Sequence, residues 1–387
     1  MPSAAAPVAP PGTTLDDPVV AAPPAPFVAP SGPVTFPLSW LLANAQPAVQ
    51  YRSLVDVARL PASGPVSNLP YAHPAALALA VAQSPDGVWN RSMLGIPSPK
   101  HPGVTGVGTI NAVRRLVESG WDRESPPLAR ARRTLFRLLA QDEDPSYLYE
   151  FGRAKQGDDL ARRGRSILRE AAAAALAQAG YEHDPRLRGA ALRMLDRING
   201  YLKSPLSQKP WVRVGNKQVL SGDAAPPSIF ALTMLAYMPQ FRHEHHEAMD
   251  RIYAHLTSTM PRQESTQLCG ETIVLQPHLV LGDMLPHRNA VDADVPFALM
   301  WLELMARLGF LRKNENWHKM FERFLDDRDR GGVWHPHKGM EAPEAVSPFV
   351  WSYFPLETTM AGESRWTDVT FRLGLIARLS GRPIELV

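Results

Sequence analysis

The sequence has few of the features that fix a chain covalently or anchor it in a membrane. It contains a single cysteine, Cys269, which excludes an intrachain disulfide and any Cys-x-x-Cys zinc or redox centre. No run of 18 apolar residues occurs, so we expect no transmembrane helix. Glycine-rich phosphate-binding motifs and the Gly-x-Ser-x-Gly motif are also missing, which removes the usual anchors for nucleotide binding and serine hydrolysis. We expect a cytoplasmic protein, with peripheral contact to a membrane left open.

The charge of the chain is close to balance. The 41 Lys and Arg residues stand against 38 Asp and Glu residues, which gives a formal net charge of +3. This excess is too small to indicate a nucleic-acid partner, and we expect none. Hydrophobic residues make up 45% of the chain and charged residues 20%, which is typical of a globular protein with a full core.

Residues 1–36 differ in composition from the rest of the chain. They are mostly Pro, Ala and Val and contain no Lys or Arg. A secretory signal begins with basic residues and a transit peptide is rich in arginine, so neither is indicated. The high proline content favours an extended backbone over a packed element. We therefore predict a disordered tail over residues 1–36 and one folded domain over residues 37–387.

From residue 36 onward the hydrophobic pattern is helical, with apolar residues recurring three and four positions apart. The clearest segments are 110–118, 128–140, 160–179, 187–202, 229–238, 245–256, 295–308, 317–325 and 369–379. Proline stands at several starts, where a missing N–H costs nothing. Glycine stands at several ends, where a left-handed residue closes a helix. We predict an all-α fold of about a dozen helices arranged as pairs.

One segment departs from the helical pattern. Residues 211–220 alternate between apolar and polar on both sides of Gly215-Asn216. A two-residue Gly-Asn loop is typical of a β-hairpin. We predict a small hairpin inserted between helices at about 210–221, either as a surface flap or at the edge of a site.

Two parts of the chain share a further pattern. An apolar helix is followed by a short polar turn and then by Gly-Val-Trp, in the sequence QSPDGVW at residues 83–89 and again at residues 332–334. The glycine fits a left-handed turn, and the indole can pack back on the end of the helix. A repeated unit of this kind indicates an array or a closed ring of helix pairs.

The first of these motifs resembles the QW motif of the prenyltransferase/squalene-cyclase superfamily. The second copy is degenerate, with Asp326 or Asp327 in the place expected for glutamine. The opening residues 40–56 and the segment 108–121 are similar to small bacterial cyclase-like proteins of this superfamily. The resemblance implies an α/α toroid of about six helix hairpins, in which such motifs tie helix ends together. The residues with this structural role are Gln83, Asp86, Gly87, Trp89, Gly332 and Trp334.

Squalene-hopene-type cyclases, which the chain resembles at its first motif, protonate an alkene with an aspartic acid of a DxDD motif. The nearest match is Asp292-Ala-Asp294-Val295, directly before an apolar helix. Two adjacent carboxyl groups can share a proton, because they resist ionising together. Asp292 and Asp294 are therefore the candidate catalytic acids. A helix N-terminus also favours an ionised aspartate as its cap, so capping is the alternative role.

Carbocation chemistry also requires aromatic faces that stabilise positive charge without attacking it. Phe297, Trp301, Trp351 and Tyr353 are the candidate substrate-binding residues for an apolar isoprenoid. Aromatic residues at helical spacing are more often part of the core, so packing is their alternative role.

We expect no metal ion or other cofactor. Histidines and acids near Cys269, and the run His243-Glu-His-His246, carry side chains that can bind metals. No aspartate-rich prenyl-diphosphate motif and no His-Glu-x-x-His pattern supports either group as a site.

Three functions stay open at this point. A terpenoid-cyclase-like enzyme needs a deep apolar cavity with a carboxyl pair at one end. A non-catalytic helical scaffold that binds a protein partner has a filled centre and an exposed apolar patch. A carbohydrate-active toroid has an open, polar groove lined by aromatic residues, with two convergent carboxylates or a His/Tyr pair. Fold class alone does not decide among them.

Overall fold

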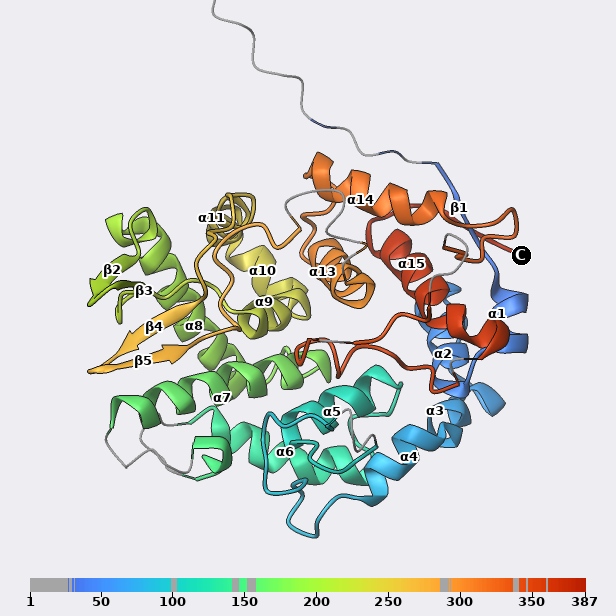
Figure 1. Ribbon diagram of the computed structural model, residues 1–387. Coiled ribbons are helices and arrows are strands. Elements are labelled where there is room, and N and C mark those ends of the chain that lie inside the picture. The colour runs from blue at the N-terminus through green and yellow to red at the C-terminus, as the bar shows by residue number, and fades with distance from the viewer. Residues whose placement is uncertain are drawn as a thin grey trace, which may run out of the picture.

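The structure is a computed structural model that describes residues 27, 30, 32–98, 103–140, 146–151, 158–285, 292, 294–336, 341–345, 347–359 and 361–387 (Figure 1). The disorder predicted for residues 1–26 concerns residues outside this range. Val34–Phe36 form strand β1, so the folded part begins before the predicted boundary at residue 37. Across the described ranges, no helix is both long and apolar enough to cross a membrane.

The described chain is largely helical. The helices are α1 (Leu38–Asn44), α2 (Pro47–Arg52), α3 (Leu69–Ala72), α4 (Pro74–Val81), α5 (Thr109–Glu118), α6 (Pro126–Leu138), α7 (Asp159–Gln178), α8 (Pro185–Lys203), α9 (Ile229–Ala236), α10 (Pro239–Glu244), α11 (His246–Leu256), α13 (Val295–Arg307), α14 (Glu315–Asp326) and α15 (Thr367–Leu379). A π-helical segment at Ser53–Val57 follows α2, and short 3₁₀ turns lie at Gly64–Asn68, Tyr149–Phe151, Pro205–Ser207 and Gly362–Trp366. Gly120, Gly180 and Gly309 follow α5, α7 and α13 with positive φ angles, as their positions after apolar segments predicted.

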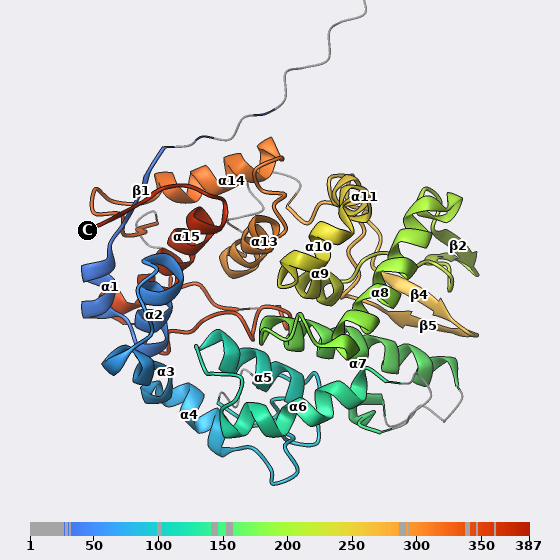
Figure 2. The same cartoon turned by 180° about the vertical axis from the view of Figure 1, so that it is seen from behind.

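The helices fall into an inner and an outer group. All eight residues of α9 are buried, and α13 and α15 are buried around most of their circumference. A helix that is apolar on all sides belongs in the interior, whereas α6, α11 and α14 keep exposed polar faces. Both views show α5, α7, α9, α13 and α15 around the middle of the molecule, with α6, α8, α11 and α14 outside them (Figures 1 and 2).

The inner helices pack in series and return to the start of the chain. α5 contacts α7, α7 contacts α9, α9 contacts α13, and α13 contacts α15. The seven residues 171–177 of α7 are six alanines and Leu176, all buried, and their small side chains let α9 approach closely. α15 then packs on α2 and on the π-helical segment, so the last inner helix touches the beginning of the helical part of the chain.

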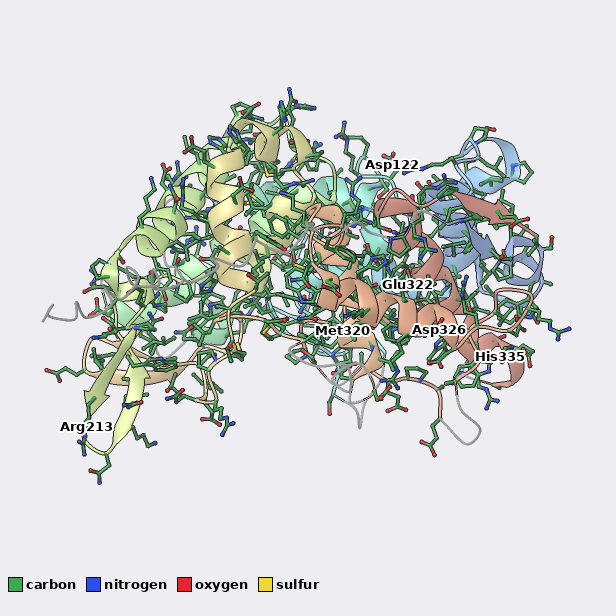
Figure 3. The ribbon with its side chains drawn as sticks, turned by 90° about the horizontal axis from the view of Figure 1, so that it is seen from above. Asp122, Arg213, Met320, Glu322, Asp326 and His335 are labelled. Carbon is green, nitrogen blue, oxygen red and sulfur yellow. The ribbon has the colours of Figure 1, made fainter. Side chains whose placement is uncertain are left out.

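Two small sheets accompany the helices, so the expectation of an all-α fold with a single hairpin insert was somewhat too narrow. β1 pairs in parallel with β6 (Ile384–Leu386), which brings the first and last described elements together. The second sheet has the order β2 (Trp211–Val214), β3 (Lys217–Leu220), β4 (Thr266–Cys269) and β5 (Thr272–Leu275). The hairpin predicted at 211–220 is confirmed, with Val214 paired to Lys217 across Gly215-Asn216. The sheet lies at the edge of the molecule, with the exposed Arg213 on its outermost hairpin (Figure 3).

The first Gly-Val-Trp turn ties three elements together. The Trp89 indole is fully buried and donates to the carbonyl of Leu79 in α4 at 2.8 Å. Gln83 Nε2 donates to the carbonyl of Pro127 in α6 at 2.8 Å, and the Trp89 backbone N–H donates to Thr109 Oγ1 of α5 at 3.1 Å. Asp86 lies in the turn, where Val88 N–H faces its Oδ1 at 3.5 Å. These contacts hold the end of α4 to α5 and α6.

The second turn repeats the backbone part of this geometry at the other end of the chain, without a hydrogen bond from the indole to any of the described residues. The backbone N–H of Trp334 donates to Thr370 Oγ1 of α15, again at 3.1 Å. Gly332 has a φ of 90°, against 86° for Gly87. Arg328 lies four residues before Gly332, as Gln83 does before Gly87, and its Nη1 donates to the carbonyl of Thr35 in β1 at 2.9 Å. Arg328 therefore occupies the position in the second turn that Gln83 occupies in the first. The prediction that Asp326 or Asp327 stands at this position was wrong.

Candidate functional site

The two aspartates predicted as catalytic acids have separate partners. Asp294 caps α13, because its Oδ1 accepts a hydrogen bond from the backbone N–H of Phe297 at 3.0 Å. Burial raises the pKa of Asp294 above its ordinary value, and that hydrogen bond opposes the rise. Asp292 is exposed and forms an ion pair with Arg323 at 2.6 Å. Neither carboxylate is hydrogen-bonded to the other, and Asp294 adopts the capping role given as its alternative.

The four predicted substrate-binding aromatics divide between the core and a group of arginines. Phe297 is partly buried against the core, and Trp301 is fully buried and meets Trp317 edge to face at 6.3 Å. The Arg115 guanidinium lies over Trp351 at 5.4 Å from the ring centre. The Arg372 guanidinium lies over Tyr353 at 3.7 Å. The faces of Trp351 and Tyr353 are therefore already next to protein cations.

A cleft of about 760 Å³ opens at the C-terminal ends of the inner helices. Its walls come from the end of α2 and the residues after it, from the C-termini of α5, α7, α13 and α15, and from Tyr237 after α9. Tyr51, Tyr71 and Trp121 give it aromatic faces. None of the four predicted substrate-binding aromatics and neither Asp292 nor Asp294 lines this cleft.

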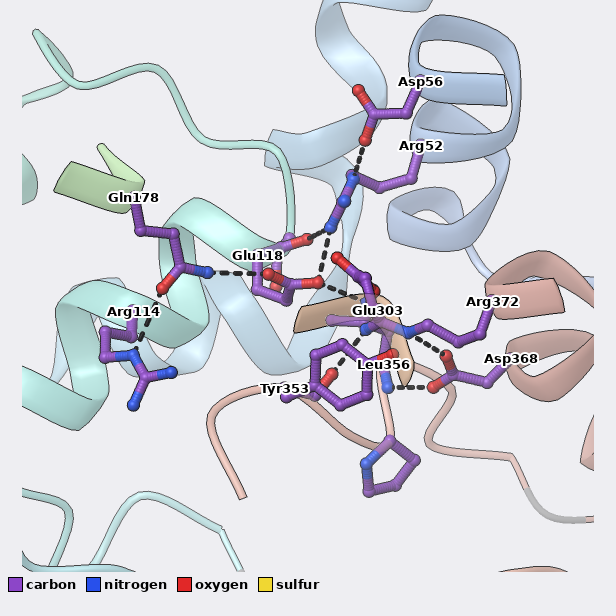
Figure 4. A network of polar contacts seen from close by, with 12 residues as sticks. Arg52, Asp56, Arg114, Glu118, Gln178, Glu303, Tyr353, Leu356, Asp368 and Arg372 are labelled. Atoms are coloured by element: carbon purple, nitrogen blue, oxygen red, sulfur yellow. Dashed lines mark hydrogen bonds and ion pairs between the residues drawn. The ribbon is translucent and has the colours of Figure 1, made fainter. Parts of the chain in front are cut away.

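Glu118, the last residue of α5, lines the cleft and lies at the centre of a network of polar contacts (Figure 4). Its carboxylate accepts hydrogen bonds from Arg52 Nη1 at 2.7 Å, from Gln178 Nε2 at 2.7 Å and from Arg372 Nη1 at 2.5 Å. Burial alone would raise its pKa, but the two arginines outweigh burial and hold the pKa of Glu118 well below its usual range. Glu118 is therefore a fixed anion that cannot act as a proton donor at neutral pH.

A second layer of ion pairs lies behind Glu118. Arg372 is fully buried and also reaches Asp368 at 3.2 Å and Glu303 at 3.3 Å, and Arg307 is paired with Glu303 at 2.8 Å. Arg372 further donates to the carbonyl of Tyr353 at 2.5 Å. We refer to Arg52, Glu118, Glu303, Arg307, Asp368 and Arg372 together as the central ion network.

The central ion network fixes an irregular segment, residues 347–359, that crosses the middle of the molecule between the inner helices (Figures 1 and 2). Asp368 accepts hydrogen bonds from the backbone N–H groups of Leu356 and Glu357. Arg115 of α5 donates to the carbonyls of Trp351 and Pro355. The backbone of this segment and the charged side chains bound to it thus occupy the middle of the molecule.

Helix ends help to explain why so many arginines are tolerated here. The C-terminus of an α-helix carries about half a negative charge, which favours cations in its last turn. Arg307 lies in the last turn of α13, and the C-termini of α5, α7 and α15 reach the same cleft. These partial charges supplement the carboxylates in compensating the buried guanidinium groups.

Fixed charges and aromatic rings line the cleft together. Glu118 is held ionised, and burial raises the pKa of Tyr237 so that its phenol keeps its proton. Charged and hydroxyl groups with fixed positions therefore face the cleft beside aromatic rings. Trp121 is held by its indole N–H, which donates to the carbonyl of Pro70 at 3.0 Å, and it meets Tyr71 edge to face at 4.9 Å.

The histidine and cysteine groups considered as metal ligands do not converge. Within the described ranges, no three His, Cys, Asp or Glu side chains are placed to hold a metal ion. The Cys269 thiol accepts a hydrogen bond from Arg163 Nε at 3.4 Å. His278 stacks on Phe230, and burial lowers its pKa to about 4. His287 and His337 lie outside the described residues.

Sequence reasoning missed the central ion network, although a signal for it is present. Glu303 and Arg372 interrupt two apolar helical segments of the C-terminal half, and Arg52 lies within the opening segment that resembles cyclase-like proteins. A charge inside an all-apolar helix must find a buried partner. Which partners these charges find depends on the packing of helices far apart in sequence, and the pattern of a single helix does not contain that information.

The chain was compared with known families, proteins and structures. No protein-family model, curated protein or solved structure matches the chain.

Proposed function

We propose that the helices form an α/α toroid. Two observations support this proposal. The inner helices contact one another in series until α15 meets α2. In both turns a side chain four residues before the glycine donates to a backbone carbonyl of another element. Gln83 reaches α6, the second helix after it, and Arg328 reaches β1 at the other end of the chain.

Within this architecture we propose that the protein binds a carbohydrate in the cleft at the C-terminal ends of the inner helices. The observation that carries the proposal is the lining of the cleft, where Tyr51, Tyr71 and Trp121 lie beside the charged groups of Arg52 and Glu118. Sugars present an apolar C–H face, which packs on aromatic rings, and hydroxyl groups, which bind to fixed charged groups. A volume of about 760 Å³ is in the range of pockets that hold small ligands.

The terpenoid-cyclase hypothesis stays a prediction and is not the one we prefer. It requires an apolar cavity, whereas seven of the residues that line this cleft are charged at neutral pH. The candidate acid Asp294 makes a cap, and the candidate aromatics Trp351 and Tyr353 lie under arginines.

The carbohydrate proposal is tested by calorimetric titration with a panel of trisaccharides: cellotriose, maltotriose, mannotriose, trigalacturonate, triglucuronate and trimannuronate. Tyr71 is 39% exposed and lines the cleft. We expect at least one trisaccharide to bind, and Tyr71→Ala to weaken that binding about fivefold, since an aromatic contact contributes about 1 kcal/mol.

Tyr149→Ala is the matched control, because Tyr149 is 38% exposed, lies outside the cleft and also meets another ring edge to face. We expect its affinity to equal that of the wild type. Failure of every trisaccharide to bind at millimolar concentration would reject the proposal, and so would an equal loss in both variants.

A second candidate function, binding of a protein partner, is favoured by α4. This helix has no polar side chain, yet Leu77 is 48% and Val81 77% exposed. A photo-crosslinking amino acid at position 81 should capture a defined protein in cells, and one at position 192 serves as control because Leu192 is 42% exposed on α8. Equal labelling from both positions would argue against a partner at α4.

A further inference from the structure

Arg59 has an unusual backbone conformation in the wall of the cleft. It follows the π-helical segment Ser53–Val57 and has a φ of 61°, in the left-handed region that glycine favours. The backbone holds this turn firmly, since the N–H groups of Ala58 and Leu60 donate to the carbonyls of Ser53 and Leu54 at 2.9 Å each. A left-handed residue other than Gly, Asn or Asp is uncommon, and π-helical segments are frequent at functional sites.

Glycine fills the comparable position elsewhere in this chain. Gly120, Gly180 and Gly309 are left-handed and end α5, α7 and α13. An arginine at such a position is less favourable for folding than a glycine, because its Cβ is crowded by the backbone. The unfavourable conformation is consistent with a role for the side chain itself, and strained residues do gather at binding sites.

Arg59 also differs from the other arginines of the cleft in its partners. Arg52 is bound to Asp56 and Glu118, Arg307 is bound to Glu303, and Arg123 donates to the carbonyl of Gly180. The exposed guanidinium of Arg59 has no hydrogen bond or ion pair within the described parts of the chain. It is therefore available to a ligand that enters the cleft.

We propose that Arg59 binds an acidic group of the ligand, so that the cleft selects acidic over neutral carbohydrates; this inference rests on the carbohydrate function proposed above. A guanidinium forms two parallel hydrogen bonds with a carboxylate, which makes arginine suited to a uronic acid. The nearest carboxylate on the same segment, Asp56, is already bound to Arg52 and does not compete for Arg59.

The test compares trigalacturonate, triglucuronate and trimannuronate with their trimethyl esters, which keep the shape of the sugar and remove the charge. Calorimetric titration is carried out on the full chain as wild type, Arg59→Gly, Arg59→Lys and Arg91→Gly. Arg91 is the matched control, because it is an exposed arginine with a φ of 47° that does not line the cleft.

We expect the wild type to bind at least one acid about tenfold more tightly than its ester, and the preference to decrease as salt is added. Arg59→Gly should remove the preference and leave the affinity for the ester unchanged. Arg59→Lys should keep part of the preference, and Arg91→Gly all of it. Replacing either arginine with glycine suits the left-handed backbone, so both glycine variants should fold.

The outcomes separate this inference from the function on which it rests. Equal binding of acids and esters by the wild type, or a preference that persists in Arg59→Gly, overturns the role of Arg59 while a carbohydrate ligand stands. Absence of binding for every acid, ester and neutral trisaccharide overturns both.

Discussion

Gly87 and Gly332 show how a single position limits the approach of two backbones. A Cβ on Gly332 would lie 2.8 Å from the Thr35 carbonyl oxygen, and one on Gly87 would lie 3.1 Å from the Arg130 carbonyl oxygen. Both residues also have positive φ angles. Two separate constraints, conformation and contact, therefore require glycine at the turns that precede Trp89 and Trp334.

The two constraints can be separated by mutation. Gly309→Ala should lower the free energy of unfolding by about 1 kcal/mol, because Gly309 is left-handed but has no atom within 4 Å of the added methyl group. Gly332→Ala should cost at least twice as much, since the methyl group also displaces the backbone of β1. Chemical denaturation of both variants measures the difference, and equal losses would mean that the contact with Thr35 is unimportant.

The pattern of residues predicted some of these details and not others. Roles for Gly87 and Trp89 could be assigned from the local turn, and the resemblance to the QW motif implied the role of Gln83. The equivalence of Arg328 with Gln83 was missed, because the two side chains share only a position before the glycine and a carbonyl acceptor. Side chains of different chemistry can meet the same acceptor, so residue type was a poor guide at that position.

At the scale of elements, the start of α13 is defined by Asp294. The helix begins at Val295-Pro296, where proline supplies no N–H, and Asp294 accepts from Phe297 instead. Asp292 lies just before it and forms an exposed pair with Arg323. The two aspartates therefore contribute to stability in different ways.

Asp294→Ala should lower the free energy of unfolding by about 1 kcal/mol through loss of the cap, and Asp294→Asn should change it little because asparagine also caps. Asp292→Ala should cost less than about 1 kcal/mol, as is usual for an exposed ion pair. Thermal or chemical denaturation of the three variants checks these values. A large loss in Asp294→Asn would show that the charge, and not the cap, is what α13 requires.

Element boundaries were the part of the fold most accessible from sequence. Apolar periodicity located the long helices, and glycine and proline marked their ends, because these signals act within a few residues. The hairpin of β4 and β5 was missed, because its segment carries no Asn-Gly or Gly-Asn turn signal. It joins the first hairpin through Gln267 of β4, which pairs with Leu220 of β3. The inner or outer place of each helix could have been inferred from composition, since α9 has a single polar residue, Thr233.

For the whole molecule, the central ion network joins α2, α5, α13 and α15. Glu118 lies between Arg52 and Arg372, all three are buried, and Arg372 extends the network to Asp368 and Glu303. Removing one partner from a buried ion pair leaves the other charge uncompensated, which costs about 3–5 kcal/mol. The network thus couples the two ends of the chain to each other.

Glu118→Gln should lower the free energy of unfolding at pH 7 by about 3 kcal/mol. The pKa of Glu118 is depressed in the folded protein, so its contribution is present above the unfolded-state pKa of about 4.3 and is lost as the pH falls below it. Denaturant unfolding between pH 7 and pH 2 should therefore show a smaller decrease in stability for the variant than for the wild type. Parallel pH profiles would contradict a depressed pKa.

The pairing of β1 with β6 also has a consequence for how the protein is made. Arg382 Nε donates to the carbonyl of Gly32, across 350 positions of the chain, and Val34 and Phe36 are each 1% exposed once the strands have paired. Closing a loop of that length carries a large entropic cost, and the contact cannot form before residues 382–387 have been synthesised. On the ribosome, the apolar side chains of β1 therefore emerge long before their partner strand and stay uncovered until it has been made, a period in which exposed apolar surface favours aggregation.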